Sequence, residues 1–193
     1  TLYSRNGKIF NNFAHIENAL SKPEYNNIVF DGEVMSDDFQ ALMKQVYRKS
    51  GANTEDAYLA LFDMLPLKEF NEGRSKLNSL ERKQELNKLS KTFGSEIKLV
   101  DYEIINFDNE QGQEKFSEMN KEALEKGFEG LMIKPNNNYY ECKRSHAWLK
   151  IKPFIEVTLK VIDIQEGTGK HEGKLGAFSV EGEDDGKFFS LSV

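Results

Sequence analysis

Cysteine and histidine are scarce in this 193-residue sequence, which has one cysteine, Cys142, and three histidines. A single cysteine excludes an internal disulfide, and His15, His146 and His171 are too far apart in sequence to suggest a zinc site with it. Any metal is therefore expected to be a hard cation held by carboxylate oxygens. Without disulfides, a reducing cytosolic setting is expected.

Long apolar runs are also missing. The sequence has no run of about 18 apolar residues, and Thr1 to Phe10 does not have the apolar centre and cleavage site of a secretory signal. We therefore expect no membrane span and no membrane partner. Hydrophobic residues make up 38% of the chain, which is enough for a buried core. A net charge of -6 disfavours a chain that coats nucleic acid all over, although one basic face is compatible with it.

Short apolar stretches alternate with amphipathic ones up to Pro153. Strands are expected at 26–34, 57–65, 97–105, 128–134 and 148–152, and helices at 36–50, 76–93 and 113–126. This order predicts an α+β domain, residues 1–153, built from antiparallel sheets with helices outside. Residues 154–193 alternate apolar and polar side chains between glycine-rich turns, which predicts the first strands of a small β-barrel.

Two of the expected helices have an apolar stripe. Ser36 is the expected cap of the first, Gly51 ends it, and its stripe consists of Phe39, Leu42, Met43, Val46 and Tyr47. The stripe of the second consists of Leu77, Leu80, Leu89 and Phe93. Both stripes are expected to face the sheet.

Two lysines alternate with two apolar residues in H-A-W-L-K-I-K-P, residues 146–153. In a strand, successive side chains point to opposite faces, so Lys150 and Lys152 share one face and Leu149 and Ile151 share the other. Alanine at Leu149 or Ile151 is expected to destabilise the domain if that face is fully buried. Parallel lysines repel each other unless an anion lies between them, so the pattern favours a phosphate site. The alternative is a solvated basic face, and the pair alone leaves both open.

Four short stretches follow one another in the order S-R-N-G-K (4–8), F-D-G-E-V (30–34), E-G-L-M-I-K (129–134) and W-L-K-I-K-P (148–153). Together with L-F-D-M-L at 61–65, they resemble the motifs of ATP-dependent DNA ligases of the covalent nucleotidyltransferase superfamily, and the small bacteriophage-like or bacterial members look most similar. In that family a lysine attacks the α-phosphate of ATP. AMP then passes to the 5′-phosphate of a nick, and the 3′-hydroxyl displaces it.

The resemblance implies ATP and Mg²⁺ as cofactors, nicked double-stranded DNA as substrate, a monomer, and the cytoplasm of a bacterial cell or of a virus-infected host. It implies that Lys150 and Lys152 face the ATP phosphates. It also implies that Glu33 contacts the ribose and helps to place the metal, with Glu129 as a second metal ligand. A surface acid in a turn remains the alternative for Glu33, and a solvated acid at a helix end for Glu129.

Two further residues receive roles from the resemblance. Arg5 is expected to bind the nucleotide or the 5′-phosphate, and a guanidinium suits phosphate because it can bind two oxygens at once. Phe62 is expected to stack on adenine, with a place in the hydrophobic core as the alternative. Lys134 belongs to the same motif as Glu129 but is interpreted as a surface charge with no step assigned.

The resemblance also divides the chain into an adenylation domain, 1–153, and the start of an oligonucleotide-binding (OB) fold, 154–193. The nucleophile motif K-x-D-G does not occur in the sequence. We therefore expect an internal fragment that has no nucleophilic lysine and is inactive in self-adenylation. RNA ligases and RNA-capping guanylyltransferases share the E-G and K-x-K motifs and remain alternatives, as does a non-catalytic nucleic-acid-binding module.

Overall fold

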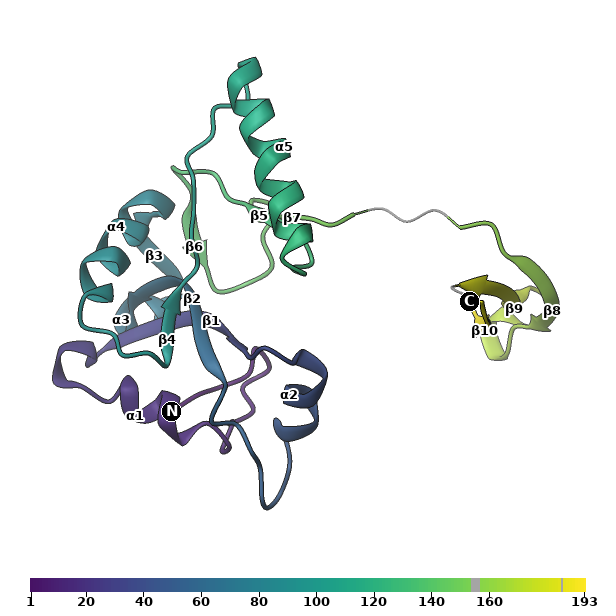
Figure 1. The fold of residues 1–193 in the computed structure, drawn as a ribbon, viewed down its shortest axis with the longest axis horizontal. Helices are drawn as coiled ribbons and strands as arrows, with labels where there is room; N and C mark the ends of the chain where they lie inside the picture. Colours follow the sequence, from purple (N-terminus) through teal and green to yellow (C-terminus); the bar gives the residue numbers. More distant parts are fainter. Residues whose placement is uncertain (154–156, 185) are drawn as a thin grey trace. The chain divides into compact units, whose positions relative to one another are not determined.

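The computed structural model of the protein describes residues 1–153, 157–184 and 186–193. The chain folds into two units. The first unit is Thr1–Lys152 and the second is Pro153–Val193 (Figure 1). Residue 154, where the second domain is predicted to begin, lies outside the described residues. Across the described parts of the chain, no helix has the length and apolar character needed to cross a bilayer.

Helices and strands are mixed in the first unit, as the α+β prediction requires. Its helices are α1 (Ala14–Ala19), α2 (Phe39–Gln45), α3 (Leu67–Asn71), α4 (Ser79–Ser90) and α5 (Glu110–Glu125), with a short 3-10 helix η1 (Pro23–Tyr25). Its strands are β1 (Ile28–Met35), β2 (Tyr58–Pro66), β3 (Arg74–Asn78), β4 (Ile97–Leu99), β5 (Leu131–Ile133), β6 (Tyr139–Glu141) and β7 (Leu149–Ile151).

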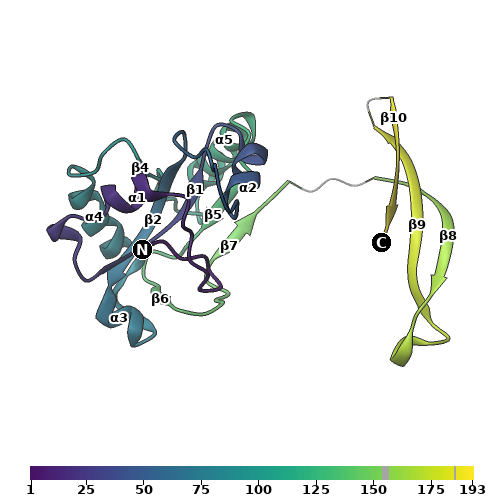
Figure 2. The ribbon, with the colours of Figure 1, turned by 90° about the horizontal axis from the view of Figure 1, so that it is seen from below.

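The central sheet has the strand order β1-β2-β4 (Figure 2). β1 and β2 are antiparallel, and so are the separate pairs β3–β6 and β5–β7. β2 and β4 are parallel, which corrects the prediction of antiparallel sheets throughout. The reason is the crossover through α3, β3 and α4, which returns the chain to the sheet in the same direction.

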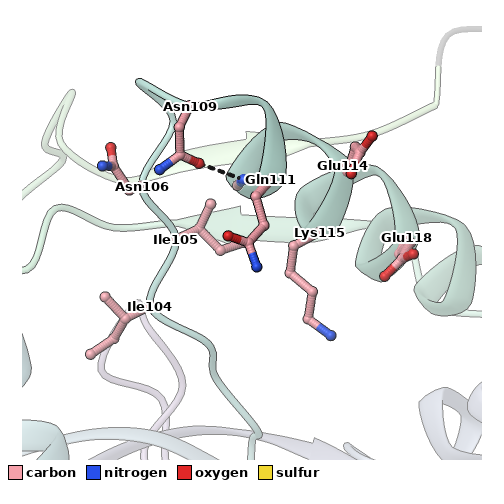
Figure 3. A pocket seen from close by; sticks show the side chains of 9 residues that line it. Ile104, Ile105, Asn106, Asn109, Gln111, Glu114, Lys115 and Glu118 are labelled. Carbon is pink, nitrogen blue, oxygen red and sulfur yellow. Dashed lines mark hydrogen bonds between the residues drawn. The ribbon is translucent and has the colours of Figure 1, made fainter.

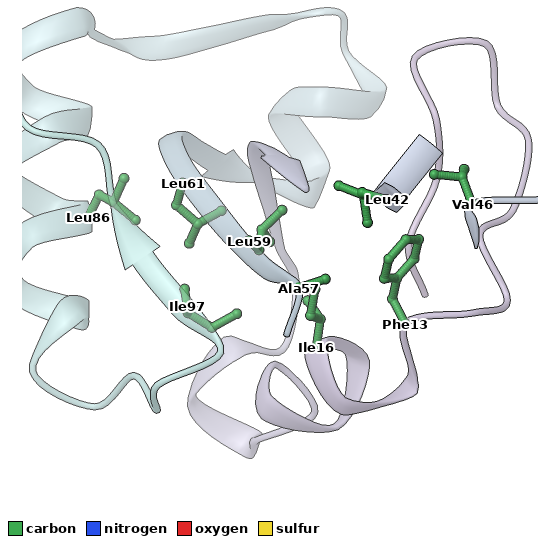
Figure 4. Close-up of a cluster of buried hydrophobic side chains, with 9 residues drawn as sticks. All are labelled: Phe13, Ile16, Leu42, Val46, Ala57, Leu59, Leu61, Leu86 and Ile97. Carbon is green, nitrogen blue, oxygen red and sulfur yellow. The ribbon is translucent and has the colours of Figure 1, made fainter. Parts of the chain in front are cut away.

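The hydrophobic core lies on one side of β2, where the buried residues alternate with half-buried ones from Leu59 to Leu65. Around these side chains pack residues of α1, α2, α4 and β4 (Figure 4). The cluster consists of Phe13, Ile16, Leu42, Val46, Ala57, Leu59, Leu61, Leu86 and Ile97.

Helix α2 differs from its prediction at both ends. Its cap is Asp38, whose carboxylate accepts a hydrogen bond from the backbone N–H of Ala41 at 2.9 Å, and not Ser36. The helix has only seven residues, so its buried contact is narrow. Leu42 and Val46 join the core, whereas Met43 and Tyr47 are exposed.

Helix α4 begins three residues later than predicted, because a capping box fixes its start. Asn78 accepts from the N–H of Glu81 at 3.0 Å, and the Glu81 carboxylate accepts from the N–H of Asn78 at 2.8 Å. Leu77 therefore belongs to β3 and not to the helix. The fully buried side chains of α4 are Arg82 and Leu86, while the predicted Leu80 and Leu89 are only half-buried.

The second unit is all-β over its described residues, as the sequence predicts. Strands β8 (Lys160–Glu166), β9 (Leu175–Asp184) and β10 (Lys187–Ser192) form an antiparallel sheet in the order β10-β9-β8, with a short 3-10 helix η2 (Gly169–His171) between β8 and β9. Val180 is its buried apolar side chain among those described. A three-stranded sheet is what the structure shows here, and not a closed barrel.

Candidate active site

Two lysines and one carboxylate meet beside the β5–β7 pair. Met132 on β5 lies opposite Lys150 on β7, and this register places Glu129 and Gly130, just before β5, next to the end of β7. The ammonium groups of Lys150 and Lys152 both contact the same oxygen, Oε2 of Glu129, the second at 3.0 Å. The two lysines therefore converge on one anionic group, and all three side chains are about half exposed or more.

Gly130 permits this close approach of the strands. Its φ of 134° lies in the region that favours glycine, and a Cβ at this position would collide with the backbone carbonyl oxygen of Ile151. Any other residue would push β5 away from β7. The glycine that follows Glu129 is thus required by the geometry that brings the carboxylate to the lysines.

The charges of this cluster stabilise one another. Hydrogen bonds from Lys150 and then Lys152 lower the pKa of Glu129 to about 2. The hydrogen bond to Glu129 raises the pKa of Lys150, and the charge of Glu33 raises it further. Glu33 on β1 therefore contributes to the electrostatic field at Lys150, although it is distant in sequence.

Leu149 does not meet the condition of burial on which its predicted effect on stability depends. Its side chain is 52% exposed, so it does not lie on a buried face of β7, whereas Ile151 is half-buried. The strand has only three residues and pairs with β5 in the described sheets, and its two apolar side chains are covered to different extents. Alternation alone indicates which side chains share a face and not whether that face is covered.

The pairing of β1 with β2 contains a β-bulge, which leaves Phe62 on β2 without a partner on β1. Asp31 lies opposite Asp63 and Gly32 opposite Leu61, so Phe62 has no partner across the sheet. Gly32 sits against β2, where an added Cβ would be 2.7 Å from the carbonyl oxygen of Ala60. Bulges of this kind redirect side chains, and the half-buried Phe62 lies outside the hydrophobic core cluster.

Phe62 packs instead against Trp148, with ring centroids 6.3 Å apart and planes at 83°. Between the rings lies the ammonium group of Lys134, which is 4.6 Å from the centroid of Phe62 and 3.5 Å from that of Trp148. The Lys134 side chain is only 14% exposed. The interpretation of Lys134 as a surface charge is therefore wrong.

Lys134 belongs to a buried polar network that the sequence reasoning missed. Arg82 on α4 donates two hydrogen bonds to Asp63 on β2, at 2.7 and 2.9 Å, and the Lys134 ammonium lies 3.9 Å from the same carboxylate. Beside it, the hydroxyl of Tyr140 donates to Asp31 at 2.7 Å. The available signal was an aspartate within the otherwise apolar strand A-Y-L-A-L-F-D-M-L, since a buried charge needs a partner.

Burial is the largest cause of the pKa shifts in this network. It raises the pKa of Asp31 despite the hydrogen bond from Tyr140, and it raises the pKa of Tyr140 well beyond its ordinary value. It also lowers the pKa of Lys134 to about 8, against the attraction of Asp63. Shifted pKa values of this kind occur both at functional sites and in buried ion-pair networks such as this one.

Arg5 lies in a tight turn at the start of the chain. The turn is closed by backbone hydrogen bonds between Ser4 and Lys8 at 2.7 Å and from Gly7 to Ser4 at 2.9 Å. The Arg5 side chain is exposed, and within the described ranges no hydrogen bond or ion pair joins it to the lysines or to Phe62. The structure therefore shows Arg5 as an exposed turn residue with no such contact to the other predicted residues among those described, and its role stays a prediction.

A hollow lies at the start of α5 and contains none of the predicted residues. Ile104, Asn109, Gln111 and Lys115 contribute to its lining (Figure 3). Asn109 is occupied as the helix cap, since its side-chain oxygen accepts from the N–H of Gly112 at 2.8 Å. This hollow is accordingly not a candidate for the active site.

The carboxylates available for a metal are few. In the described portion of the chain, no three histidine, cysteine, aspartate or glutamate side chains are grouped as metal ligands. Glu33 and Glu129 are both exposed, and Mg²⁺ commonly takes one or two carboxylates while water and phosphate oxygens complete its shell. The donor set therefore fits a weakly held Mg²⁺ and not a tightly bound structural metal.

Comparison with known proteins identifies the family. A family model described as "ATP dependent DNA ligase domain" matches residues 1–152, which is 152 of the 193 residues. The chain belongs to this family of ATP-dependent DNA ligases. The resemblance seen in the sequence motifs is thereby confirmed.

Individual relatives agree with this assignment. DNA ligase 2 of Methanosarcina acetivorans is 30% identical over 169 residues, which are 79% of this chain and 28% of that protein. The DNA ligase of Thermococcus onnurineus is 36% identical over 135 residues, which are 65% of this chain and 21% of that protein. The chain thus spans under a third of the length of each of these relatives.

Solved structures show the same fold. Pmar-Lig_PreS3 is 51% identical, with a TM-score of 0.86 over 98% of this chain and 46% of that one. The ATP-dependent DNA ligase from bacteriophage T7, in complex with ATP, has a TM-score of 0.57 at 20% identity over 98% of this chain and 67% of that one. At that identity the likeness establishes the mixed α+β fold alone.

Proposed function

We propose that this chain supplies the nucleotide-handling surface of a DNA ligase that seals nicks in duplex DNA through lysine-AMP and DNA-adenylate intermediates. The observation that carries the proposal is the convergence of Lys150 and Lys152 on a single oxygen of Glu129. Two cations held on one anionic group have the geometry needed to hold a phosphate group.

The two lysines would offset charge on the ATP phosphates during transfer. Phosphoryl transfer depends on positioning and on charge stabilisation, because there is little covalent chemistry for the protein itself to perform. Glu129 holds the place of a phosphate in the cluster, so an incoming phosphate competes with it for Lys150 and Lys152. Release of Glu129 would free its carboxylate for another ligand.

Glu33 and Glu129 would hold Mg²⁺, which supplies charge neutralisation at the phosphates when it is bound. Phe62 would stack on adenine through its open side, and Arg5 would bind the nucleotide or the 5′-phosphate of the nick. The sequence has no K-x-D-G, so the nucleophilic lysine of the first step is not among its residues.

The finer domain assignment is part of the same proposal. Residues 1–153 form the adenylation domain, and residues 154–193 begin an OB fold. The antiparallel sheet of β8, β9 and β10 supports the second assignment, because OB folds are built from antiparallel strands. We also propose that the protein acts as a monomer with ATP, Mg²⁺ and nicked DNA.

Titration of the chain with ATP by calorimetry tests the phosphate site. Lys150→Ala and Lys152→Ala should each weaken binding about tenfold or more, whereas Lys143→Ala should not. Lys143 is the matched control because it is an exposed lysine that pairs with a different carboxylate, that of Glu141, at 3.3 Å. Equal affinity in all four proteins would contradict the proposal.

The substrate is tested with a chimera in which the K-x-D-G segment of a relative precedes Thr1. Sealing of nicked DNA is expected, and preferential sealing of nicked RNA or transfer of GMP to RNA ends would favour an RNA ligase or a capping enzyme instead. Binding of nicked DNA with no adenylate formed would favour the non-catalytic module.

A further inference from the structure

Lys134 has an unusual environment for a lysine. Its ammonium group is buried, has no hydrogen-bond partner among the described residues, and lies between two aromatic rings set almost at right angles. A buried donor without a hydrogen bond is costly to a fold, and the carboxylate of Asp63, at 3.9 Å, offsets only part of that cost. The contacts with Phe62 and Trp148 are cation–π contacts, which partly replace the missing hydrogen bonds.

We propose that Lys134 is the positioning residue of the base pocket: its ammonium group holds Phe62 and Trp148 in place and prepares the open side of Phe62 for an electron-rich purine. This inference rests on the proposed function, in which Phe62 stacks on adenine. Lys134 acts on the base through Phe62.

Lys134 contacts one face of the Phe62 ring, since its ammonium group lies over the ring at 4.6 Å from the centroid. The Phe62 side chain is only partly buried, so part of it is still accessible to a ligand. A cation on one face of a ring draws electron density towards it and leaves the opposite face poorer in electrons. Such a face attracts an electron-rich base more strongly than an unperturbed phenyl ring does.

The charge of Lys134 should therefore control nucleotide affinity. The groups around it are Asp31 and Asp63, which attract the ammonium charge, and Arg82 and Lys83, which repel it. Tyr140 stays neutral, because burial raises its pKa above its ordinary value. Since the pKa of Lys134 is about 8, its charge is lost within an accessible pH range, and ATP should bind more weakly as the pH rises through that value.

Stability should respond in the opposite direction. The folded state lowers the pKa of Lys134 from 10.5 to about 8, so the buried charge opposes folding below about pH 8. Its deprotonation relieves that cost as the pH rises from about 8 towards 10.5. A purely structural lysine would therefore strengthen the fold with rising pH and leave ATP affinity unchanged.

Trp148 provides the readout, because it is the only tryptophan in the sequence. Its fluorescence in the chain should change with a midpoint near pH 8, and Lys134→Met should abolish that change. Lys83→Met is the matched control: Lys83 also has a pKa lowered by burial, but its ammonium lies 5.3 Å from the ring centroid of Tyr102. Its removal should shift the midpoint upwards, because Lys83 lowers the pKa of Lys134.

ATP binding by the same proteins decides the proposal. From about pH 7 to about pH 9, the wild-type affinity should fall roughly tenfold, in proportion to the protonated fraction. Lys134→Arg keeps its charge and should bind ATP well at both values, whereas Lys134→Met should bind weakly at both. If Lys134→Met binds ATP as tightly as the wild type, with the same pH dependence, this inference alone falls. If the wild type binds no ATP at any pH, the proposed function falls as well.

Discussion

The two charged clusters of the first unit use the same residue types in opposite surroundings. Glu129 with Lys150 and Lys152 is exposed, whereas Asp63 with Arg82 is almost fully buried. Water screens the first cluster, so its ion pairs contribute little to stability and can be exchanged for ligands. The second is shielded from water, so removing one partner would leave an uncompensated buried charge and destabilise the fold. Solvent exposure thus separates the groups available for chemistry from those that hold the fold.

The largest expected effect is on the buried cluster. Asp63→Asn removes the charge that Arg82 requires, and breaking a buried pair typically costs about 3–5 kcal/mol of unfolding free energy. Urea denaturation measures it. Glu129→Gln makes the same chemical change in the exposed cluster and should leave the midpoint nearly unchanged. Similar losses in both variants would remove the distinction drawn between the clusters.

The same contrast between buried and exposed positions can be tested with two leucines. Leu61 is completely buried, so Leu61→Ala should destabilise the protein by about 2–5 kcal/mol. Leu149 alternates with the lysines but is 52% exposed, so Leu149→Ala should change the unfolding free energy by only about 0.5 kcal/mol. Thermal melts distinguish the two. A large loss for Leu149→Ala would show that another element covers β7.

Substitutions in the exposed cluster should affect formation of lysine-AMP strongly and stability little. In the chimera carrying K-x-D-G, Lys150→Ala or Lys152→Ala should slow formation of lysine-AMP by about 100- to 1000-fold while the melting temperature stays the same, because each change removes a cation that offsets charge on the phosphates. Adenylation gels measure the rate. Normal adenylation in both variants would mean that β7 has a solvated basic face and no phosphate site.

The smallest effect concerns the exposed cluster at low pH. The pKa of Glu129 is about 2 in the folded protein and 4.5 ordinarily, so its contribution to stability is present above 4.5 and is lost as the pH falls towards 2. Because water screens this contribution, it should be small. The urea midpoints of wild type and Glu129→Gln should therefore differ slightly at about pH 5 and converge near pH 2. A gap that widens at low pH would contradict this.

Local patterns predicted those parts of the structure that depend on neighbouring residues. The apolar stretches around Phe30 and Leu61 became β1 and β2, and the alternation at Lys150 and Lys152 correctly indicated a shared side. The start of α4 was predicted wrongly. The apolar helical pattern extends upstream of Asn78, whereas the capping box of Asn78 and Glu81 begins the helix at Ser79.

Features that depend on distant partners could not be predicted in this way. The burial of Lys134 depends on Phe62 and Trp148, which approach it only in the folded chain. The exposure of Leu149 depends on which elements approach β7 in the folded chain, and the sequence of the strand carries no information about that. The roles assigned to the site residues remain predictions.

The parallel pairing of β2 with β4 has a consequence for the order of folding. β2 ends at Pro66 and β4 begins at Ile97, so the two strands can meet only after the chain between them has closed a long loop. The antiparallel β1–β2 pair needs no such crossover, whereas the chain between β2 and β4 includes α4, which packs against β2. We therefore expect β4 to pair with β2 after the rate-limiting step of folding. A smaller side chain at position 97, as in Ile97→Ala, should then accelerate unfolding and leave the refolding rate almost unchanged.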